Sequence, residues 1–269
     1  MKGWLIWGYD VEGDRYLRAA TILAASIKAT QKHNAAVAVV VNQAAKISAS
    51  QRKLFDYIVP IHTDYPTEIM SLGYELSPFH ETISIESDCI LCSDVSHWWN
   101  VLGQHDMLFP GRVLDSRGKT IDKSYYRSGF VKHGLADIWS GMFYWQKSKT
   151  ASDVFKSAKS FCEHWREEGM PFEWTENAAN DEFFAAVLAK LDHQDCIDQS
   201  GFFTFTHNRP RDQVQYLSKV ELGANDFNVT SDGAVWLGPW RQRGVLHYHN
   251  KTWITADLEE TVKGWLDER

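Results

Sequence analysis

The chain has 269 residues, of which 44% are hydrophobic and 13% aromatic, so it can bury a full core and fits one large α/β domain or a domain with a small appendage. This composition argues against a disordered protein. The net charge of −7 argues against a general nucleic-acid coat or a membrane-surface protein, although it does not exclude a local basic groove. No apolar run approaches the roughly 20 residues of a membrane span and no signal-peptide pattern opens the chain, so we expect a cytoplasmic, soluble protein.

The first part of the chain alternates strands with helices. The apolar run at 4–9 predicts a strand, and apolar residues at helical spacing from 16 to 27 predict a helix, with Asp14 as its cap or as a charge that favours the helix dipole. A β-branched run predicts a strand at 37–41 that is covered on both faces, followed by a short helix at 48–55 and a strand at 57–59. This order predicts an α/β fold with a mostly parallel, Rossmann-like sheet flanked by helices.

Residues 83–92 predict a buried strand that contains two carboxylates. Glu86 and Asp88 are two residues apart, so an extended backbone would direct both side chains to one face, where they could coordinate one hard cation or its bound diphosphate. Acids at the carboxyl end of a strand lie where open α/β sheets bind ligands, although a solvent-exposed strand end would also explain them. Cys89 and Cys92 form a Cys-x-x-Cys here, but no second pair completes a zinc site, so we expect reduced thiols.

A basic segment follows a predicted helix at 94–102 and a predicted strand at 107–109. From residue 112 to residue 132 the chain is polar and lacks a sustained apolar period, which indicates a surface excursion near 112–135. It is either a solvated loop or a site for anionic groups. Six basic residues, two acidic residues and three aromatic residues mark it: Arg112, Arg117, Lys119, Lys123, Arg127 and Lys132; Asp115 and Asp122; Tyr125, Tyr126 and Phe130.

The second half of the chain holds two further candidate segments. Ser140 and Gly141 lie within a predicted strand at 138–145, and glycine in a strand usually means that something approaches the backbone closely. An amphipathic helix at 154–165 and a helix from Asn180 follow, the latter with Asp181 in a first turn where the helix dipole favours acids. His247 and His249 are two apart and would share one face of a strand, and a final helix covers 258–266.

Several of these segments resemble, in order, those of GT-A fold glycosyltransferases of the glycogenin-like and lipopolysaccharide-galactosyltransferase group. Residues 77–82 and the strand after them are similar to the segment that carries the group's Asp-x-Asp, with Glu86 in place of the first aspartate. The stretch from Tyr9 to residue 28 is similar to the group's opening strand and helix. The Ser140-Gly141 pair is similar to its Asn-Ser-Gly strand, with Trp139 at the asparagine position, and 180–182 to its Asp-Gln helix start. Residues 247–253 are similar to its closing His-Tyr and Lys-Pro-Trp, with threonine at the proline position.

The resemblance implies a single GT-A domain over residues 1–269 and a set of site residues. Glu86, Asp88 and His247 would hold Mn²⁺ or Mg²⁺, with His249 as the competitor for the histidine position. Asp181 would orient the transferred sugar. The donor-binding residues implied are Tyr9, Asp10, Tyr16, Ser140, Gly141 and Lys251, of which Lys251 would also neutralise the leaving diphosphate.

From this resemblance we expect a metal-dependent glycosyltransferase that moves a sugar from a nucleoside diphosphate sugar to a carbohydrate or another hydroxyl acceptor, with retention of configuration. A catalytically silent nucleotide-sugar-binding module is an alternative. A nucleotidyltransferase is a second alternative, but such enzymes commonly carry a basic glycine-rich loop after the first strand, and residues 8–13 are acidic.

A modified DNA base is a further, less favoured acceptor. If the basic segment and other basic loops meet around the catalytic pocket, they could attract a polyanion, and aromatic side chains could stack on its bases. The additional residues that this hypothesis uses are Arg209, Arg211, Trp240, Arg241 and Arg243.

Overall fold

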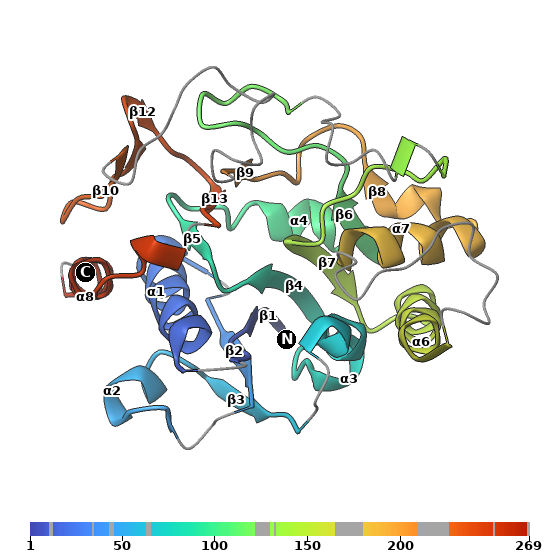
Figure 1. The fold of residues 1–269 in the computed structure, drawn as a ribbon, viewed down its shortest axis with the longest axis horizontal. Coiled ribbons are helices and arrows are strands. Elements are labelled where there is room, and N and C mark those ends of the chain that lie inside the picture. The colour runs from blue at the N-terminus through green and yellow to red at the C-terminus, as the bar shows by residue number, and fades with distance from the viewer. Residues whose placement is uncertain are drawn as a thin grey trace.

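A seven-stranded sheet forms the centre of the protein (Figure 1). The computed structural model describes residues 1–10, 13–33, 35–42, 46–62, 66–121, 130–131, 133–164, 180–208, 226–249 and 251–267. The strands lie in the order β3 (Tyr57–Pro60), β2 (Val37–Val41), β1 (Lys2–Trp7), β4 (Glu81–Glu86), β7 (Met142–Gln146), β6 (Met107–Pro110) and β8 (Ile197–Asp198).

The strand directions confirm the predicted mostly parallel α/β sheet. β3, β2, β1 and β4 are mutually parallel, β7 runs antiparallel to both β4 and β6, and β8 is parallel to β6. Every residue of β2 is buried, as expected for a β-branched strand that is covered on both faces. The carboxyl ends of the four parallel strands therefore lie along one edge of the sheet, which is where such sheets bind ligands.

Two apolar cores cover the two faces of this sheet because alternate strand residues point to opposite sides. Trp4 and Ile6 of β1 contact one core with helices α1 (Arg15–Thr30), α4 (Trp98–Leu102) and α8 (Ala256–Gly264). Leu5 and Trp7 contact the other core, together with the 3-10 helix η2 (Pro66–Leu72) and helices α6 (Lys149–His164) and α7 (Asn180–Lys190). Figure 1 shows α1 and α8 on one side of the sheet and α6 and α7 on the other.

Two three-stranded sheets and several short helices complete the described fold. The first sheet has the order β5 (Cys89–Leu91), β13 (Val245–His247) and β9 (Thr206–His207), and it follows directly on the end of β4. The second consists of β10 (Phe227–Val229), β11 (Val235–Leu237) and β12 (Trp240–Arg241). The remaining short elements are α2 (Ala49–Arg52), α3 (Gly73–Leu76), η4 (Gln194–Cys196) and η7 (Lys251–Trp253).

Three sequence predictions differ from the structure. The strand predicted at 83–92 is two strands in different sheets, because the chain turns at Ser87 and Asp88 between β4 and β5. The strand predicted at 138–145 begins only at Met142, so Ser140 and Gly141 lie in the turn before β7. The helix predicted from 94 is shorter and begins at Trp98. The other predicted helices and strands are present, although Trp165 lies outside the described residues.

The described part of the basic segment packs on β9. Leu114 forms isolated bridges with Thr120 and Thr206, and the carboxylate of Asp115 accepts from the backbone N–H groups of Arg117 and Lys119. Residues 122–129 and 132 of this segment, and the arginines at 209 and 211, lie outside the described residues. No helix in the described ranges has the length and apolar composition needed to cross a membrane.

Candidate functional site

Two carboxylates and one imidazole converge at the carboxyl end of β4. Glu86 ends β4 and Asp88 lies in the turn that follows, while His247 ends β13. The antiparallel pairing of β5 with β13 places Cys89 opposite His247, and the N–H of Tyr248 donates to the carbonyl of Asp88 at 3.0 Å. The turn after Glu86, rather than one extended strand, therefore brings the two acids together around the histidine.

The spacing of these three ligand atoms fits a small divalent cation. His247 Nε2 lies 3.0 Å from Glu86 Oε2 and 3.2 Å from Asp88 Oδ1. Octahedral bonds of about 2.0–2.1 Å, as for magnesium, would separate neighbouring ligand atoms by roughly 2.8–3.0 Å, and calcium bonds by more than about 3.2 Å. Neither ring nitrogen of His247 has a well-formed hydrogen bond in the described residues. A cation would satisfy this buried nitrogen and both acids at once.

Burial and charge act in opposite directions on His247. The side chain is 2% exposed, and this burial lowers its pKa, but the negative charges of Asp88 and Glu86 outweigh that effect and raise the pKa to about 9. A protonated imidazole balances part of the carboxylate charge when no cation is bound. A metal ion must displace that proton, because only the neutral imidazole has a free lone pair.

Gly141 leaves room for the His247 ring. A Cβ atom at position 141 would lie 3.1 Å from His247 Nδ1 and 3.3 Å from its Cε1. The Gly141 carbonyl also accepts a 2.9 Å hydrogen bond from the N–H of Glu86. The group that closely approaches the Gly141 backbone is therefore the ring of His247, a candidate metal ligand. The approach occurs in the turn before β7 and not within a strand.

Asp181 is joined to this group through Ser140. Its Oδ1 atom accepts from the backbone N–H and from the hydroxyl of Ser140, both at 2.6 Å. Asp181 lies in the first turn of α7, so the turn before β7 connects the start of that helix to Gly141 and His247. The structure thus brings together the candidates at 86, 88, 140, 141, 181 and 247.

The donor candidates near the start of the chain lie one strand away from Glu86. Trp7 pairs with Glu86 in the register of β1 and β4, and Tyr9 and Asp10 follow Trp7 at the same edge of the sheet. Asp10 is buried, and its Oδ1 and Oδ2 accept from the backbone N–H groups of Tyr16 at 2.7 Å and Leu17 at 3.0 Å. Asp10 therefore caps α1. Asp14 makes no side-chain capping bond, so the first of the two roles expected for it, that of the cap, is wrong.

Two other candidates, His249 and Lys251, follow His247 in the sequence. β13 ends at His247, and His249 has a φ of 52°. The prediction that the side chains of His247 and His249 lie on the same face of one strand is therefore wrong. The group with both carboxylates contains His247 and not His249. Lys251 begins η7, four residues after His247, and its side chain lies outside the described part of the structure.

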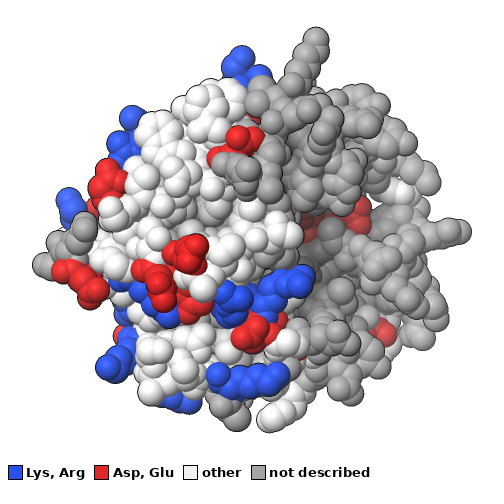
Figure 2. All heavy atoms as spheres, turned by 60° about the vertical axis from the view of Figure 1, so that its left-hand side comes forward, with Lys and Arg blue, Asp and Glu red and all other residues white. Residues whose placement is uncertain are grey.

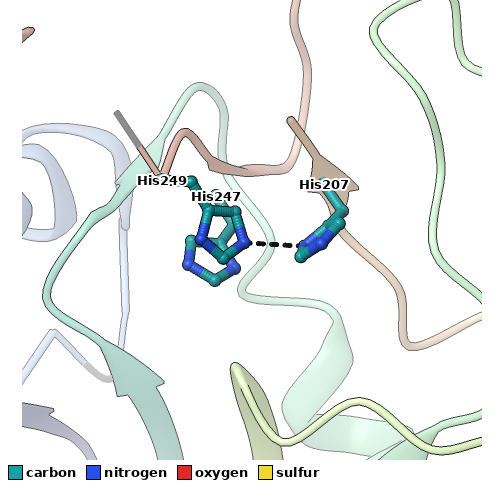
Figure 3. Close-up of side chains that lie close together, drawn as sticks. All are labelled: His207, His247 and His249. Carbon is teal, nitrogen blue, oxygen red and sulfur yellow. Dashed lines mark hydrogen bonds between the residues drawn. The ribbon is translucent and has the colours of Figure 1, made fainter. Parts of the chain in front are cut away.

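Sequence reasoning missed His207, which lies beside His247 and His249 (Figure 3). His207 stands alone in the sequence without a ligand-like spacing, and only the pairing of β9 with β13 reveals its place. His249 Nε2 lies 3.3 Å from His207 Nδ1, and the ring centroids of His247 and His249 are 3.7 Å apart.

Comparisons with known proteins agree with this architecture. No family model matches the chain, and no curated protein matches it in sequence. The glycosyltransferase GlyE of Streptococcus pneumoniae TIGR4 superposes with a TM-score of 0.52 at 11% identity, over 99% of this chain and 63% of GlyE. This chain thus spans less than two thirds of GlyE.

The galactosyltransferase LgtC, solved with donor and acceptor sugar analogs, superposes with a TM-score of 0.52 at 13% identity, over 99% of this chain and 95% of LgtC. An active-site mutant of LgtC gives a TM-score of 0.50 at 12% identity. Identities this low establish a shared fold and no more. The chain therefore has the GT-A fold of these glycosyltransferases, as its sequence resemblance indicates.

Proposed function

We propose that this protein is a metal-dependent glycosyltransferase that moves a sugar from a nucleoside diphosphate sugar to a carbohydrate or another hydroxyl acceptor. The observation that carries the proposal is the convergence of Glu86, Asp88 and the buried Nε2 of His247 at the ligand-binding edge of a GT-A sheet. The structure of LgtC with donor and acceptor sugar analogs, which has this fold, supports the choice of substrates.

Glu86, Asp88 and His247 would hold Mn²⁺ or Mg²⁺. Two carboxylates and one neutral imidazole form a mixed oxygen and nitrogen set that suits a cation of borderline hardness such as manganese. A bound divalent cation supplies positive charge to the diphosphate of the donor. The residues themselves fix the position of that charge, because His247 is packed against Gly141 and Asp88 is held by the Tyr248 N–H.

The neighbouring residues would each bind a different part of the nucleotide-sugar donor. Tyr9, Asp10 and Tyr16 lie at the end of β1, where the base would bind, with Asp10 acting through the α1 start that it caps. Asp181 would orient the transferred sugar, since Ser140 fixes one of its carboxylate oxygens. Lys251 would neutralise charge on the leaving diphosphate. Retention of configuration rests on the sequence resemblance to the glycogenin-like group.

A catalytically silent nucleotide-sugar-binding module is the second candidate. Glu86 replaces the aspartate of the resembled motif, and Trp139 stands at its asparagine position, where it packs against His207 with 4.6 Å between ring centroids. Donor hydrolysis in the presence of manganese separates the two candidates, because a silent module would bind the donor without consuming it.

A carbohydrate acceptor is favoured over DNA. Arg117 is paired with Asp115 at 2.7 Å, so its charge is partly neutralised. On the face drawn in Figure 2, lysines and arginines are interspersed with acidic side chains. Leu114 does connect the basic segment to β9 beside the site, so DNA remains an outcome to test: phosphate contacts would make binding fall steeply with salt.

The decisive experiment measures binding and turnover of a panel of nucleoside diphosphate sugars with manganese and with a chelator. Asp88→Asn and His247→Ala should each lower donor binding or turnover at least about tenfold, since loss of a metal ligand exceeds the usual effect of its supporting partners. The exposed Asp267→Asn is the matched control. Unchanged turnover in chelator would exclude the metal mechanism, and a damaging His249→Ala beside a silent His247→Ala would reverse the ligand assignment.

A further inference from the structure

His207, His247 and His249 form a second group of potential ligands, of which the proposed donor site uses only His247. β9 and β13 are parallel neighbours with His207 in register with His247, so these two side chains leave the small sheet on the same face. The positive φ of His249 turns the chain back, so that its ring stacks on that of His247. Three imidazoles, from β9, from β13 and from the segment after β13, thus lie side by side (Figure 3).

One distance within this group matches that of a tetrahedral metal centre. Each histidine offers one nitrogen, and these nitrogens lie within 4.8 Å of one another. Zinc–nitrogen bonds of about 2.0–2.1 Å at tetrahedral angles would separate neighbouring nitrogens by roughly 3.3–3.4 Å. The separation of His249 Nε2 and His207 Nδ1 is 3.3 Å. A hydrogen bond between the two rings would give a similar distance, so metal binding is the property to test.

The chemistry of this group differs from that of the carboxylate group. Imidazole-only sets suit zinc, copper and nickel, whereas carboxylates suit manganese and magnesium. His207 is 5% exposed and His247 is 2% exposed, so the surrounding protein holds both rings in place. We propose that His207, His247 and His249 form a second metal site, selective for zinc-type ions, which shares His247 with the Glu86 and Asp88 site.

Because both metal sites use His247, only one of them can be occupied at a time. Gly141 packs against the Nδ1 edge of His247, which leaves Nε2 as the ligand atom for either group. Nε2 also lies 3.0 Å from Glu86 and 3.2 Å from Asp88, so one lone pair serves both sites. Zinc bound to the histidines therefore withdraws His247 from manganese. The proposal concerns metal binding alone and stands even if the sugar-transfer proposal fails.

The test titrates the metal-free protein with zinc, manganese and cobalt chlorides and needs no nucleotide sugar. His207→Gln should lower zinc affinity at least about tenfold and weaken the intense visible absorption of tetrahedral cobalt, while its manganese affinity stays within about threefold of wild type. Asp88→Asn should show the reverse pattern, and His247→Ala should lose both metals. The exposed His80→Gln is the matched control and should bind both metals as wild type does. Zinc should also displace manganese from the wild-type protein.

Two results would overturn the proposal. If His207→Gln binds zinc as tightly as His80→Gln does, the contact between His207 and His249 is a hydrogen bond only. If Asp88→Asn loses zinc and manganese equally, zinc occupies the carboxylate site. His249→Asn provides a second variant should His207→Gln fail to fold, because asparagine tolerates the positive φ at 249 while lacking an imidazole. Circular dichroism of each variant confirms that it is folded.

Discussion

At the scale of single residues, the position of the His247 ring depends on the absence of a side chain at Gly141. The ring lies between two carboxylates on one edge and the Gly141 backbone on the other. A buried ring in that position cannot move without losing one of these contacts. The sequence indicated a close approach at Gly141, but it could not identify His247 as the group that approaches, because more than one hundred residues separate them.

Replacement of Gly141 by alanine tests this packing. The new Cβ would lie 3.1 Å from His247 Nδ1, so the ring must shift away from Gly141. We expect a loss of about 1–3 kcal/mol in the free energy of unfolding, as for other overpacked sites, together with weaker manganese binding. Urea denaturation and calorimetry measure the two effects.

Gly264→Ala is the control for this change, since a Cβ at that position, the last residue of α8, meets nothing within 4 Å. Its stability should be unchanged or slightly raised, because alanine restricts the unfolded chain more than glycine does. Equal effects of the two alanines would show that the ring of His247 is not confined by Gly141.

At the scale of elements, the start of α1 depends on a residue that precedes the helix by several positions. Asp10 lies after β1, and its carboxylate accepts from two N–H groups of the first turn. Its own N–H donates to Asn42 Oδ1 and its carbonyl accepts from Asn42 Nδ2, at 3.1 and 2.6 Å. The same residue therefore ties together the end of β1, the start of α1 and the chain after β2.

Asp10→Ala should destabilise the protein by about 1–2 kcal/mol, because two N–H groups at the start of α1 lose their acceptor. Asp14→Ala should change stability by less than about 0.5 kcal/mol, since Asp14 is exposed and makes no capping bond. Urea denaturation of both variants decides between the two caps. A larger loss of stability for Asp14→Ala would show that Asp14 is the cap of α1.

Local sequence predicted most of the elements but not their tertiary pairings. The strand at 37–41 and the helix starting at Asn180 follow from apolar patterns that each segment carries by itself. The turn at Ser87 could not be predicted in this way, because the apolar residues on both sides of it have the pattern of one continuous strand. His207 could not be predicted as a site residue for a related reason. It lies beside His247 only because β9 pairs with β13, and part of the chain between these two strands lies outside the described ranges.

At the scale of the whole molecule, a bound cation would join residues that lie far apart in the sequence, Glu86 and Asp88 with His247. Manganese at about one hundred times its dissociation constant should raise the free energy of unfolding by about 2.7 kcal/mol, because it binds only the folded chain. Thermal unfolding with manganese should therefore show a higher Tm than thermal unfolding with chelator.

Asp88→Asn should lose this rise in Tm, while Asp267→Asn should keep it. The same rise in both variants would mean that manganese stabilises the protein elsewhere. This measurement reports occupancy of the site without any substrate, so it separates metal binding from sugar transfer.

The location of β13 has a consequence for how the protein is made. β13 is the middle strand of its small sheet and supplies His247, while the acids come from a part of the chain that leaves the ribosome much earlier. A nascent chain that has completed β4 and β5 carries Glu86 and Asp88 without their imidazole, and contacts between such distant segments form late because closing a long loop is costly. During synthesis, the affinity of the nascent chain for manganese should therefore rise steeply only after residue 247 has left the ribosome and β13 has paired with β5.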